Sequence, residues 1–379
     1  MDKQASLQHP VCLNLKINPT DLDSIKTAIN RIQPQWKKEE IAVEKFSQAG
    51  SLHDMFCCRL VSDSARQKAL TLRVVDDFSS DLVTRTREVV GMQIANQAGC
   101  GIPLRGILDN ALVMDYCSGR PMTHADFMDP NISRSLCRSL ARFHCIDTDK
   151  VSVVGADGQQ EEVEKLDPIF LMEMLIDIIP SSYKDPTVQD RIVKNVGSRA
   201  DLLKEGKWLL KLVESLRLPL VFSHNDINHR NALYNQQNDL TYLVSFEMCS
   251  HSYPAMDIIF YYYGLPLWGK LGLCSPEEGA KGVSSEFLQN LFKSYLEESN
   301  RVKQKKPEVS QQQLECFSAQ AEICACVMFF TYCLSMLGQA GKPAQFDPVE
   351  QACISAKEYF TRKEKLESYA EIYKQLSKS

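Results

Sequence analysis

Residues 221–234 read VFSHNDINHRNALY, and this stretch does more than any other to decide the fold. It contains His224, Asp226 and Asn231 in the pattern H-x-D-x-x-x-x-N, directly after an apolar run. The Asn and Asp residues between them favour turns, which predicts a loop. Strand-like segments flank that loop at 218–222, 231–234 and 240–246.

A loop of this kind is typical of phosphoryl transfer. Asp226 would orient and deprotonate an attacking hydroxyl, and Asn231 would supply a neutral oxygen to a magnesium ion. His224 would brace the backbone near the metal site. The alternative is an Asx-rich turn between two strands with no chemistry of its own. If the loop is catalytic, a nucleotide-binding part should precede it and a second metal ligand should follow it.

The part of the chain before the loop has the required plan. Residues 18–32 predict an N-terminal helix that Thr20 would cap. Five strands and one helix follow, the strands at 41–46, 55–61, 69–75, 102–107 and 111–116, and the helix at 82–98. We expect a small antiparallel sheet carrying one helix over residues 1–117, which ends in the hinge-like sequence CSGR at 117–120.

Helical patterns dominate residues 118–379. One helix begins at Asn131 or Ser133 and continues to His144. Further helices are predicted at 170–179, 191–216, 286–298, 311–337 and 349–376. The chain is therefore predicted to be an α+β protein, with a sheet-based first lobe and a mainly helical second lobe.

Arg73 lies in the third predicted strand, in LTLRVVDD, and Glu88 lies on the helix that follows. An arginine in an apolar strand is costly unless it is paired. In kinase-like lobes a cation at this place binds nucleotide phosphates and is held by a glutamate of that helix. The alternative is an arginine on the solvent face of the strand, with Glu88 a surface charge.

Two further segments are candidates for binding phosphate and metal. Ser47 and Gly50 lie between the first two strands, where a phosphate-covering loop belongs, although a plain hairpin turn explains them equally well. Ser245 stands where the strand after the catalytic loop should carry a metal-binding aspartate. Glu247 would share its face by the period-2 rule and take over part of that role. Asp257, at a helix start, would cap backbone N–H groups near the loop.

Composition excludes several classes of function. The chain has 379 residues, 44% of them hydrophobic and 24% charged, which suits two lobes with cores of their own. A formal net charge of -5 does not indicate the basic surface that nucleic-acid binding requires. The start, MDKQASLQHP, lacks the apolar region of a signal peptide, and no membrane span is expected. The fourteen cysteines lack metal-ligand spacing and predict reduced thiols in a cytoplasmic protein.

Taken together, these pieces resemble the choline/ethanolamine kinase family, within the wider group that includes aminoglycoside phosphotransferases. The resemblance covers about residues 40–365. It is carried by LTLRVVDD, TREVVGMQIANQAGCG, NALVMDYCSGRPM, SLARFHCID, FSHNDINHRNALY, VSFEMCSHSYPAMDI and AKEYFTRK. It implies a protein-kinase-like bilobal fold and phosphorylation of the hydroxyl of choline or ethanolamine, with ATP and Mg²⁺.

The resemblance also implies roles for particular residues. Asp226 becomes the base, Asn231 a metal ligand, and Arg73 the phosphate cation with Glu88 as its partner. Asp115, Tyr116 and Cys117 become part of the adenine hinge. Where the family places aromatic side chains against the substrate ammonium, this chain offers Phe330, Tyr332 and Tyr261 to Tyr263, and Tyr253 is a further candidate for substrate binding. The same aromatics at helical spacing are also explained as core residues.

Three hypotheses follow from the residues and the resemblance. The first is an active choline or ethanolamine kinase acting on a small amino-alcohol, with a homodimer left open. The second is a catalytically weakened pseudokinase, because Ser245 replaces the family's metal aspartate and a hydroxyl is a poorer magnesium ligand. The third is an aminoglycoside- or homoserine-type kinase that uses the same loop.

Overall fold

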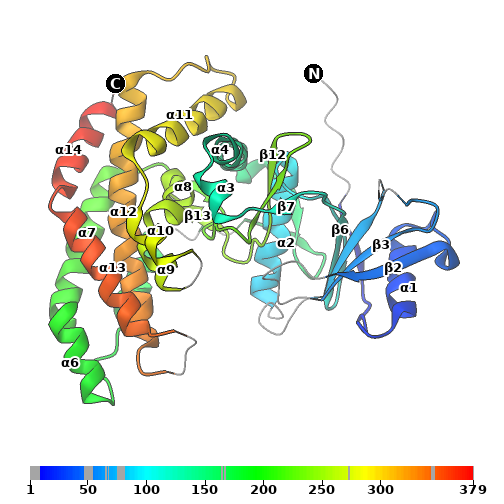
Figure 1. Ribbon diagram of the computed structural model, residues 1–379, viewed down its shortest axis with the longest axis horizontal. Helices are drawn as coiled ribbons and strands as arrows, with labels where there is room; N and C mark the ends of the chain where they lie inside the picture. The colour runs from blue at the N-terminus through cyan, green and yellow to red at the C-terminus, as the bar shows by residue number, and fades with distance from the viewer. Residues whose placement is uncertain are drawn as a thin grey trace. The chain divides into compact units, whose positions relative to one another are not determined.

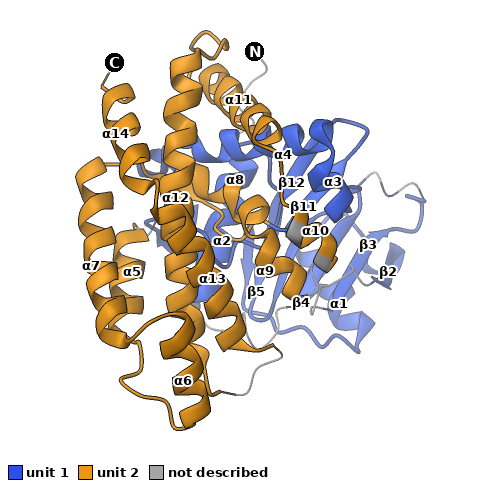
Figure 2. Cartoon of the chain, turned by 60° about the vertical axis from the view of Figure 1, so that its left-hand side comes forward, with its two compact units in different colours: residues 1–164, 228–249 blue, residues 165–227, 250–379 orange. Residues whose placement is uncertain are grey.

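A computed structural model gives the fold of the chain. It describes residues 9–46, 54–64, 66, 68–74, 82–163, 165, 168–271, 274–342 and 346–378. The chain divides into two compact units, which Figure 2 colours separately. Unit 1 contains residues 1–164 and 228–249, and unit 2 contains residues 165–227 and 250–379. This division does not coincide with the lobe boundary predicted after Cys117, which stays a prediction.

Unit 1 is built on a six-stranded sheet in the order β1-β5-β6-β4-β3-β2. Figure 1 labels β2, β3 and β6 of this sheet. Its strands are β1 (Val11–Leu13), β2 (Ile41–Phe46), β3 (Met55–Leu60), β4 (Leu70–Val74), β5 (Leu104–Leu108) and β6 (Ala111–Asp115). All neighbours pair antiparallel except β1 and β5, which are parallel. The five predicted strands are confirmed. The sequence analysis missed β1, because three residues are too few to show an alternating pattern.

Helix α1 (Leu22–Ile32) covers one face of this sheet. Its buried residues Ile25, Ala28, Ile29 and Ile32 belong to a core that includes Leu72 of β4. Its N-cap is Asp21, whose side chain accepts a hydrogen bond from the Asp23 N–H, so the prediction that Thr20 caps the helix is wrong. The Thr20 hydroxyl instead donates to Asn18.

The second sheet helix, α2 (Leu82–Gln97), contacts β4 from the other face through its side chains. Successive residues of a strand point to opposite faces, so Leu72 points toward α1 and Arg73 points away from it. Arg73 pairs there with Glu88 of α2. The ends of α2 agree with the predicted helix at 82–98 within one residue.

The rest of unit 1 packs around a small three-stranded sheet, β12-β11-β7. The elements are β7 (Arg120–Pro121), α3 (His124–Met128), α4 (Pro130–His144), β8 (Val153–Val154), β9 (Gln160–Glu161), β11 (Ala232–Asn235) and β12 (Leu240–Leu243). Helix α4 packs on β12, where the Ser139 hydroxyl donates to the Thr241 carbonyl at 2.6 Å. Helix α4 begins at Pro130 with Asp129 as its N-cap, one residue before the predicted start at Asn131, and it ends at His144 as predicted.

Unit 2 is mainly helical, as predicted. Its elements are α5 (Pro168–Asp177), α6 (Pro186–Asn195), α7 (Arg199–Leu216), β10 (Val221–Ser223), β13 (Ser250–Ser252), α8 (Pro254–Tyr263), α9 (Leu265–Lys270), α10 (Pro276–Lys281), α11 (Ser285–Val302), α12 (Gln311–Gln339), α13 (Pro348–Lys363) and α14 (Leu366–Leu376). Strands β10 and β13 pair antiparallel. Two predicted helices are each two helices. Gly197 has a φ of 116°, which ends α6, and Ser198 then caps α7. The predicted helix 349–376 likewise breaks between α13 and α14.

Helix α12 forms the centre of unit 2 and contacts α5, α7, α8, α11, α13 and α14 (Figure 1). Among the described residues it is the one helix long and apolar enough, by length and composition, to cross a membrane. However, 72% of its most apolar window is buried within the protein. Phe329, Cys324 and Leu334 are fully buried on it, so α12 has the surroundings of a core helix. Cys324 thus serves as a small core residue, as expected for several cysteines.

Candidate active site

The loop that carries Asp226 is held by Asp257 within unit 2. Asp257 lies in the first turn of α8 and is fully buried. Its two carboxylate oxygens accept the backbone N–H groups of His224 and Asn225, each at 2.7 Å. The Asn225 side chain also donates to the Ser250 hydroxyl at 2.9 Å. The predicted role of Asp257 as a cap for backbone N–H groups of this loop is confirmed.

His224 holds the backbone of Asp226, two residues further along the loop. Its side chain is fully buried, and its Nδ1 accepts the backbone N–H of Asp226 at 3.3 Å. Asn225 between them has a φ of 62°, a left-handed conformation that asparagine tolerates better than most residues. These bonds fix the backbone on both sides of Asn225. The backbone at Asp226 is therefore fixed, and so is the direction in which its side chain begins.

The second half of the loop belongs to unit 1. The Asn231 N–H donates to the Asn228 carbonyl at 3.1 Å, and the Arg230 N–H donates to the Asn228 side chain at 2.9 Å. Asn231 is 7% exposed, and its own carbonyl accepts the Val244 N–H at 3.1 Å. Asn231 is thus tied to the chain segment that carries Ser245 and Glu247.

Within unit 1 three charged side chains meet. Arg73 and Glu88 form a buried ion pair, as predicted, and are 7% and 1% exposed. Glu247 joins them, with its carboxylate 3.8 Å from Nη1 of Arg73. Burial and then the negative charge of Glu88 raise the pKa of Glu247 to about 7, against the opposing effect of Arg73. Two carboxylates therefore lie beside one guanidinium, and the charge of Arg85 also interacts with those of Glu88 and Arg73.

The segment that holds Ser245 is not a strand. Strand β12 ends at Leu243, and Ser245 has a φ of 67°. The prediction that Ser245 and Glu247 share a strand face is therefore wrong, because period-2 alternation holds only in extended backbone. Phe246 between them is 1% exposed and packs against Phe143, with ring centroids 5.7 Å apart. The chain turns at Ser245, and after this turn the Glu247 carboxylate lies near Arg73.

A glycine that the sequence analysis did not single out allows α2 to approach this segment. A Cβ atom at Gly91 would lie 2.5 Å from Cβ of Phe246 and 2.9 Å from Sγ of Cys249. Only glycine fits at so short a distance. An isolated glycine inside a helical pattern was the available signal for such close packing.

The predicted hinge residues lie at the end of β6. Asp115 accepts two hydrogen bonds from Arg105, each at 2.6 Å, and the Tyr116 N–H donates to the Ala69 carbonyl at 2.9 Å. Cys117 is half-buried, and its sulfur accepts the Gly119 N–H at 3.3 Å. Asp115 and the Tyr116 N–H thus have partners inside unit 1. The adenine-binding role of the three residues stays a prediction.

The candidate phosphate loop, Ser47 and Gly50, lies outside the described residues. The candidate substrate aromatics all lie in unit 2. Tyr253 precedes α8 and is 3% exposed, and Phe330 is 2% exposed with its ring 5.0 Å from that of Tyr359. Tyr332 is half-buried and meets Trp268 edge-on at 6.2 Å. The burial of Phe330 favours the core interpretation for that residue, and a substrate role of the three stays a prediction.

A sheet with a buried Arg–Glu pair, followed by a loop with Asp and then Asn, defines the kinase-like class of small-molecule phosphotransferases. A sequence model described as choline/ethanolamine kinase matches residues 44–360. The chain therefore belongs to the choline/ethanolamine kinase family.

Curated relatives are similar along nearly the whole chain. Ethanolamine kinase 1 of Mus musculus is 23% identical over 90% of this chain and 89% of its own length. A probable ethanolamine kinase of Nematostella vectensis is 24% identical over 92% of this chain and 96% of its own.

Solved structures share the fold. A choline kinase from Cryptosporidium parvum has a TM-score of 0.63 at 15% identity, over 94% of this chain and 99% of that chain. An ethanolamine kinase from Plasmodium vivax has a TM-score of 0.61 at 12% identity, over 89% and 86%. The expected protein-kinase-like fold, with an antiparallel sheet in its first part and helices in its second, is thus confirmed.

Proposed function

We propose that this protein transfers the γ-phosphoryl group of ATP to the hydroxyl of ethanolamine or choline. The observation that carries the proposal is the buried pair of Arg73 and Glu88, joined by Glu247. Buried ionisable groups with shifted pKa values are typical of functional sites, and the pKa of Glu247 is raised to about 7 beside this pair.

The residues of unit 1 suit a nucleotide with its magnesium ion. The Asn231 carboxamide and the Glu247 carboxylate are oxygen ligands of the type that Mg²⁺ prefers, and Ser245 would add a neutral hydroxyl. Arg73 would bind phosphate oxygens, held in direction by Glu88. When bound, Mg²⁺ neutralises charge on the transferred phosphoryl group. The raised pKa of Glu247 fits this role, because a neighbouring cation would bring the carboxylate back to its ionised form.

Asp226 would act on the acceptor. Its carboxylate would accept a hydrogen bond from the substrate hydroxyl, orient the oxygen for attack, and take the proton late in the reaction. The bonds from Asp257 to residues 224 and 225 fix the loop before substrate arrives. Such preorganisation is a large part of catalysis when the transition state is loose.

The choice of acceptor rests on the family and its named relatives, several of which are ethanolamine kinases. An ammonium group is recognised by aromatic faces and carboxylates. Tyr253, Tyr332 and Phe330 remain the candidates for that recognition in this chain.

A second candidate function is a weakened kinase that still binds nucleotide. The observation in its favour is Ser245, which supplies a neutral hydroxyl where the family pattern has a carboxylate. Loss of a metal carboxylate commonly costs about 3–5 kcal/mol of transition-state stabilisation. Glu247 is the residue that would limit this loss.

The first experiment measures magnesium-dependent ADP release with ethanolamine, with choline and with no acceptor, alongside Asp226→Asn. Turnover that requires an amino-alcohol and disappears in the variant would support the kinase and name its substrate. Nucleotide binding without turnover on either acceptor would favour the weakened kinase. Turnover unchanged in Asp226→Asn would contradict the assignment of the base.

A further inference from the structure

Helix α2 is held on two opposite faces. Thr86 and Gln93 are seven residues apart and therefore lie on one face, two turns from each other. Glu88 and Gly91 lie on the opposite face, toward Arg73 and Phe246. The position of α2 decides whether Glu88 reaches Arg73. Contacts that fix the face of Thr86 and Gln93 therefore also fix the position of Glu88 on the opposite face.

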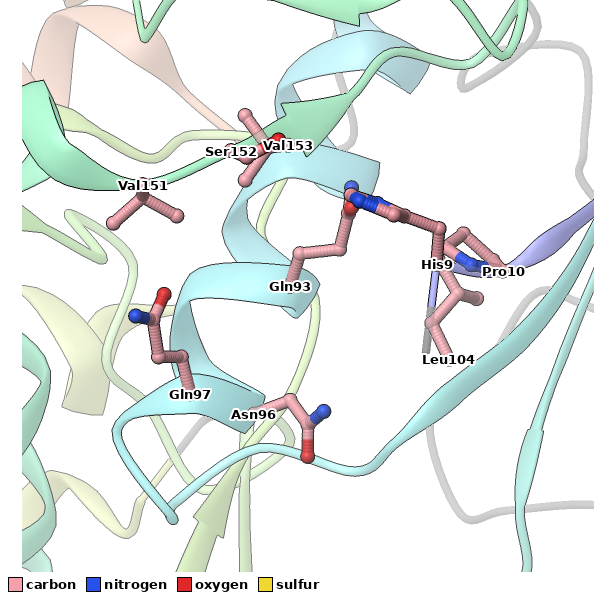
Figure 3. Close-up of a pocket in the computed structure, with 9 residues that line it drawn as sticks. All are labelled: His9, Pro10, Gln93, Asn96, Gln97, Leu104, Val151, Ser152 and Val153. Carbon is pink, nitrogen blue, oxygen red and sulfur yellow. The ribbon is translucent and has the colours of Figure 1, made fainter. Parts of the chain in front are cut away.

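The first face is bonded to the hairpin formed by β8 and β9. The Gln93 side chain donates to the Val154 carbonyl at 2.8 Å and accepts the Val154 N–H at 3.2 Å. The Gln93 side-chain amide thus forms hydrogen bonds with both the carbonyl and the N–H of Val154. Gln93 also donates to the Val89 carbonyl of its own helix at 3.0 Å, and it is 9% exposed. Figure 3 shows Gln93 on α2 beneath the chain that leads into β8.

A second bond strengthens the same attachment. The Thr86 hydroxyl accepts the Ala156 N–H at 3.2 Å from the turn of the hairpin. Backbone groups in buried places need partners, so the hairpin and α2 complete each other's hydrogen bonding. The hairpin is short, with two-residue strands, and it depends on α2 for this contact.

We propose that Gln93 is a positioning residue for the phosphotransfer reaction, which holds Glu88 against Arg73 by fixing α2 to the β8–β9 hairpin. It touches neither substrate nor nucleotide in this role. The opposite face supplies the coupling, because Gly91 is in close contact with Phe246 and a shift of α2 therefore displaces Glu88 and Phe246 together. The inference rests on the proposed function, since it concerns the affinity of the same site for nucleotide.

The test is a double-mutant cycle between Gln93→Leu and Glu88→Gln, read as the affinity for Mg-ADP and as the KM for ATP. Leucine keeps most of the side-chain volume but cannot form the two hydrogen bonds to the Val154 backbone. We expect Gln93→Leu alone to weaken Mg-ADP binding and raise the KM for ATP about tenfold. The KM for the amino-alcohol should stay unchanged. In the Glu88→Gln background the same change should have less than about a twofold effect.

Two further variants make the cycle decisive. Gln97→Leu removes the same type of side chain from the same helix at an exposed position, and it should leave both constants unchanged (Figure 3). Thr86→Val removes one hydrogen bond to the hairpin and should raise the KM for ATP by a smaller factor. This variant provides the test if Gln93→Leu fails to fold.

The outcomes separate the inference from the proposed function. Additive effects of Gln93→Leu and Glu88→Gln, in a wild-type protein that binds Mg-ADP, would overturn the inference alone. Equal losses of affinity for nucleotide and amino-alcohol would also overturn it. A wild-type protein that binds no nucleotide would overturn the proposed function and the inference with it.

Discussion

Both carboxylate oxygens of Asp257 are used by the backbone that carries Asp226. Asparagine has the same shape but only one acceptor oxygen, so in Asp257→Asn one buried N–H of the loop would face an amide donor. An unsatisfied buried donor costs about 1–3 kcal/mol. We expect kcat to fall about 10- to 100-fold, because the loop loses its fixed direction while the base itself is intact.

Steady-state kinetics and urea unfolding would check this expectation. The matched control is Glu286→Gln, which neutralises an acid in the first turn of another helix of unit 2 at an exposed position. The control should leave kcat unchanged. Equal kcat values for Asp257→Asn and wild type would mean that the loop is held by other bonds.

Ser245 is the other residue whose replacement is informative. Its left-handed backbone, with a φ of 67°, is a conformation that aspartate and asparagine adopt more readily than most residues. Ser245→Asp should therefore fit without strain and restore the family's carboxylate. We expect the magnesium concentration for half-maximal activity to fall several-fold. Ser245→Asn controls for the backbone, and an equal fall in both variants would contradict a role for the added charge.

At the scale of elements, helix α3 depends on a single carboxylate. Asp126 accepts two bonds from Arg120, at 2.6 and 2.7 Å, and completes a capping box with Thr123. The bonds from Arg120 and then the Thr123 N–H outweigh burial and lower the pKa of Asp126 to about 2. Since the pKa is lower in the folded state, the stabilisation is present above pH about 4 and is lost as the pH falls toward 2.

Asp126→Asn should therefore lower the free energy of unfolding by about 1–2 kcal/mol at pH 7, a value reduced by the exposure of Arg120. The difference from wild type should shrink as the pH is lowered from 5 to 3. Urea unfolding at several pH values in this range measures it. A difference that is constant with pH would show that the amide simply packs worse, and that the ionised group is not the source.

The elements could be predicted from the sequence where the pattern is local. Strands β2, β3 and β4 alternate or are continuously apolar, and they were placed within one residue. The errors occur where a single backbone torsion determines the end of a helix or strand. Gly197 divides α6 from α7, and Ser245 ends the predicted strand, and neither positive φ can be read from periodicity. The cap of α1 was predicted at Thr20 and lies at Asp21, because several Asx, Ser and Thr residues compete at this helix start.

The candidate site was predictable in part for the same reason. Arg73 and Glu88 were found because a cation in an apolar strand demands a partner, and Asp257 because an acid at a helix start accepts N–H groups. Gln93 could not be found, since its partner is a backbone 61 residues away and a glutamine on a helix gives no signal.

At the scale of the whole molecule, the chain builds each unit from two separate stretches. Unit 1 takes residues 228–249 from beyond the first stretch of unit 2. Those residues supply partners that the N-terminal stretch cannot replace. Leu233 pairs with Pro121, Leu243 donates to the Cys100 carbonyl at 2.8 Å, and Phe246 packs against Phe143. The sheet of β1 to β6 is thus complete in residues 1–164, but the layer beneath α4 is not.

A fragment of residues 1–164 should therefore fail to fold cooperatively. It would expose the apolar side of α4 and leave the face of α2 at Gly91 without Phe246. The same fragment joined to residues 228–249 through a flexible Gly/Ser linker of about 20 residues should regain cooperative urea unfolding, because the linker only replaces chain that belongs to unit 2. Circular dichroism and amide NMR spectra of the two proteins compare them directly. A linked protein carrying Phe246→Ala is the matched control and should lose about 3–5 kcal/mol, the usual cost of deleting a buried phenyl ring. Equal unfolding curves for the two fragments would show that β11, β12 and Phe246 add nothing to the stability of unit 1, and would place the cooperative boundary before residue 164.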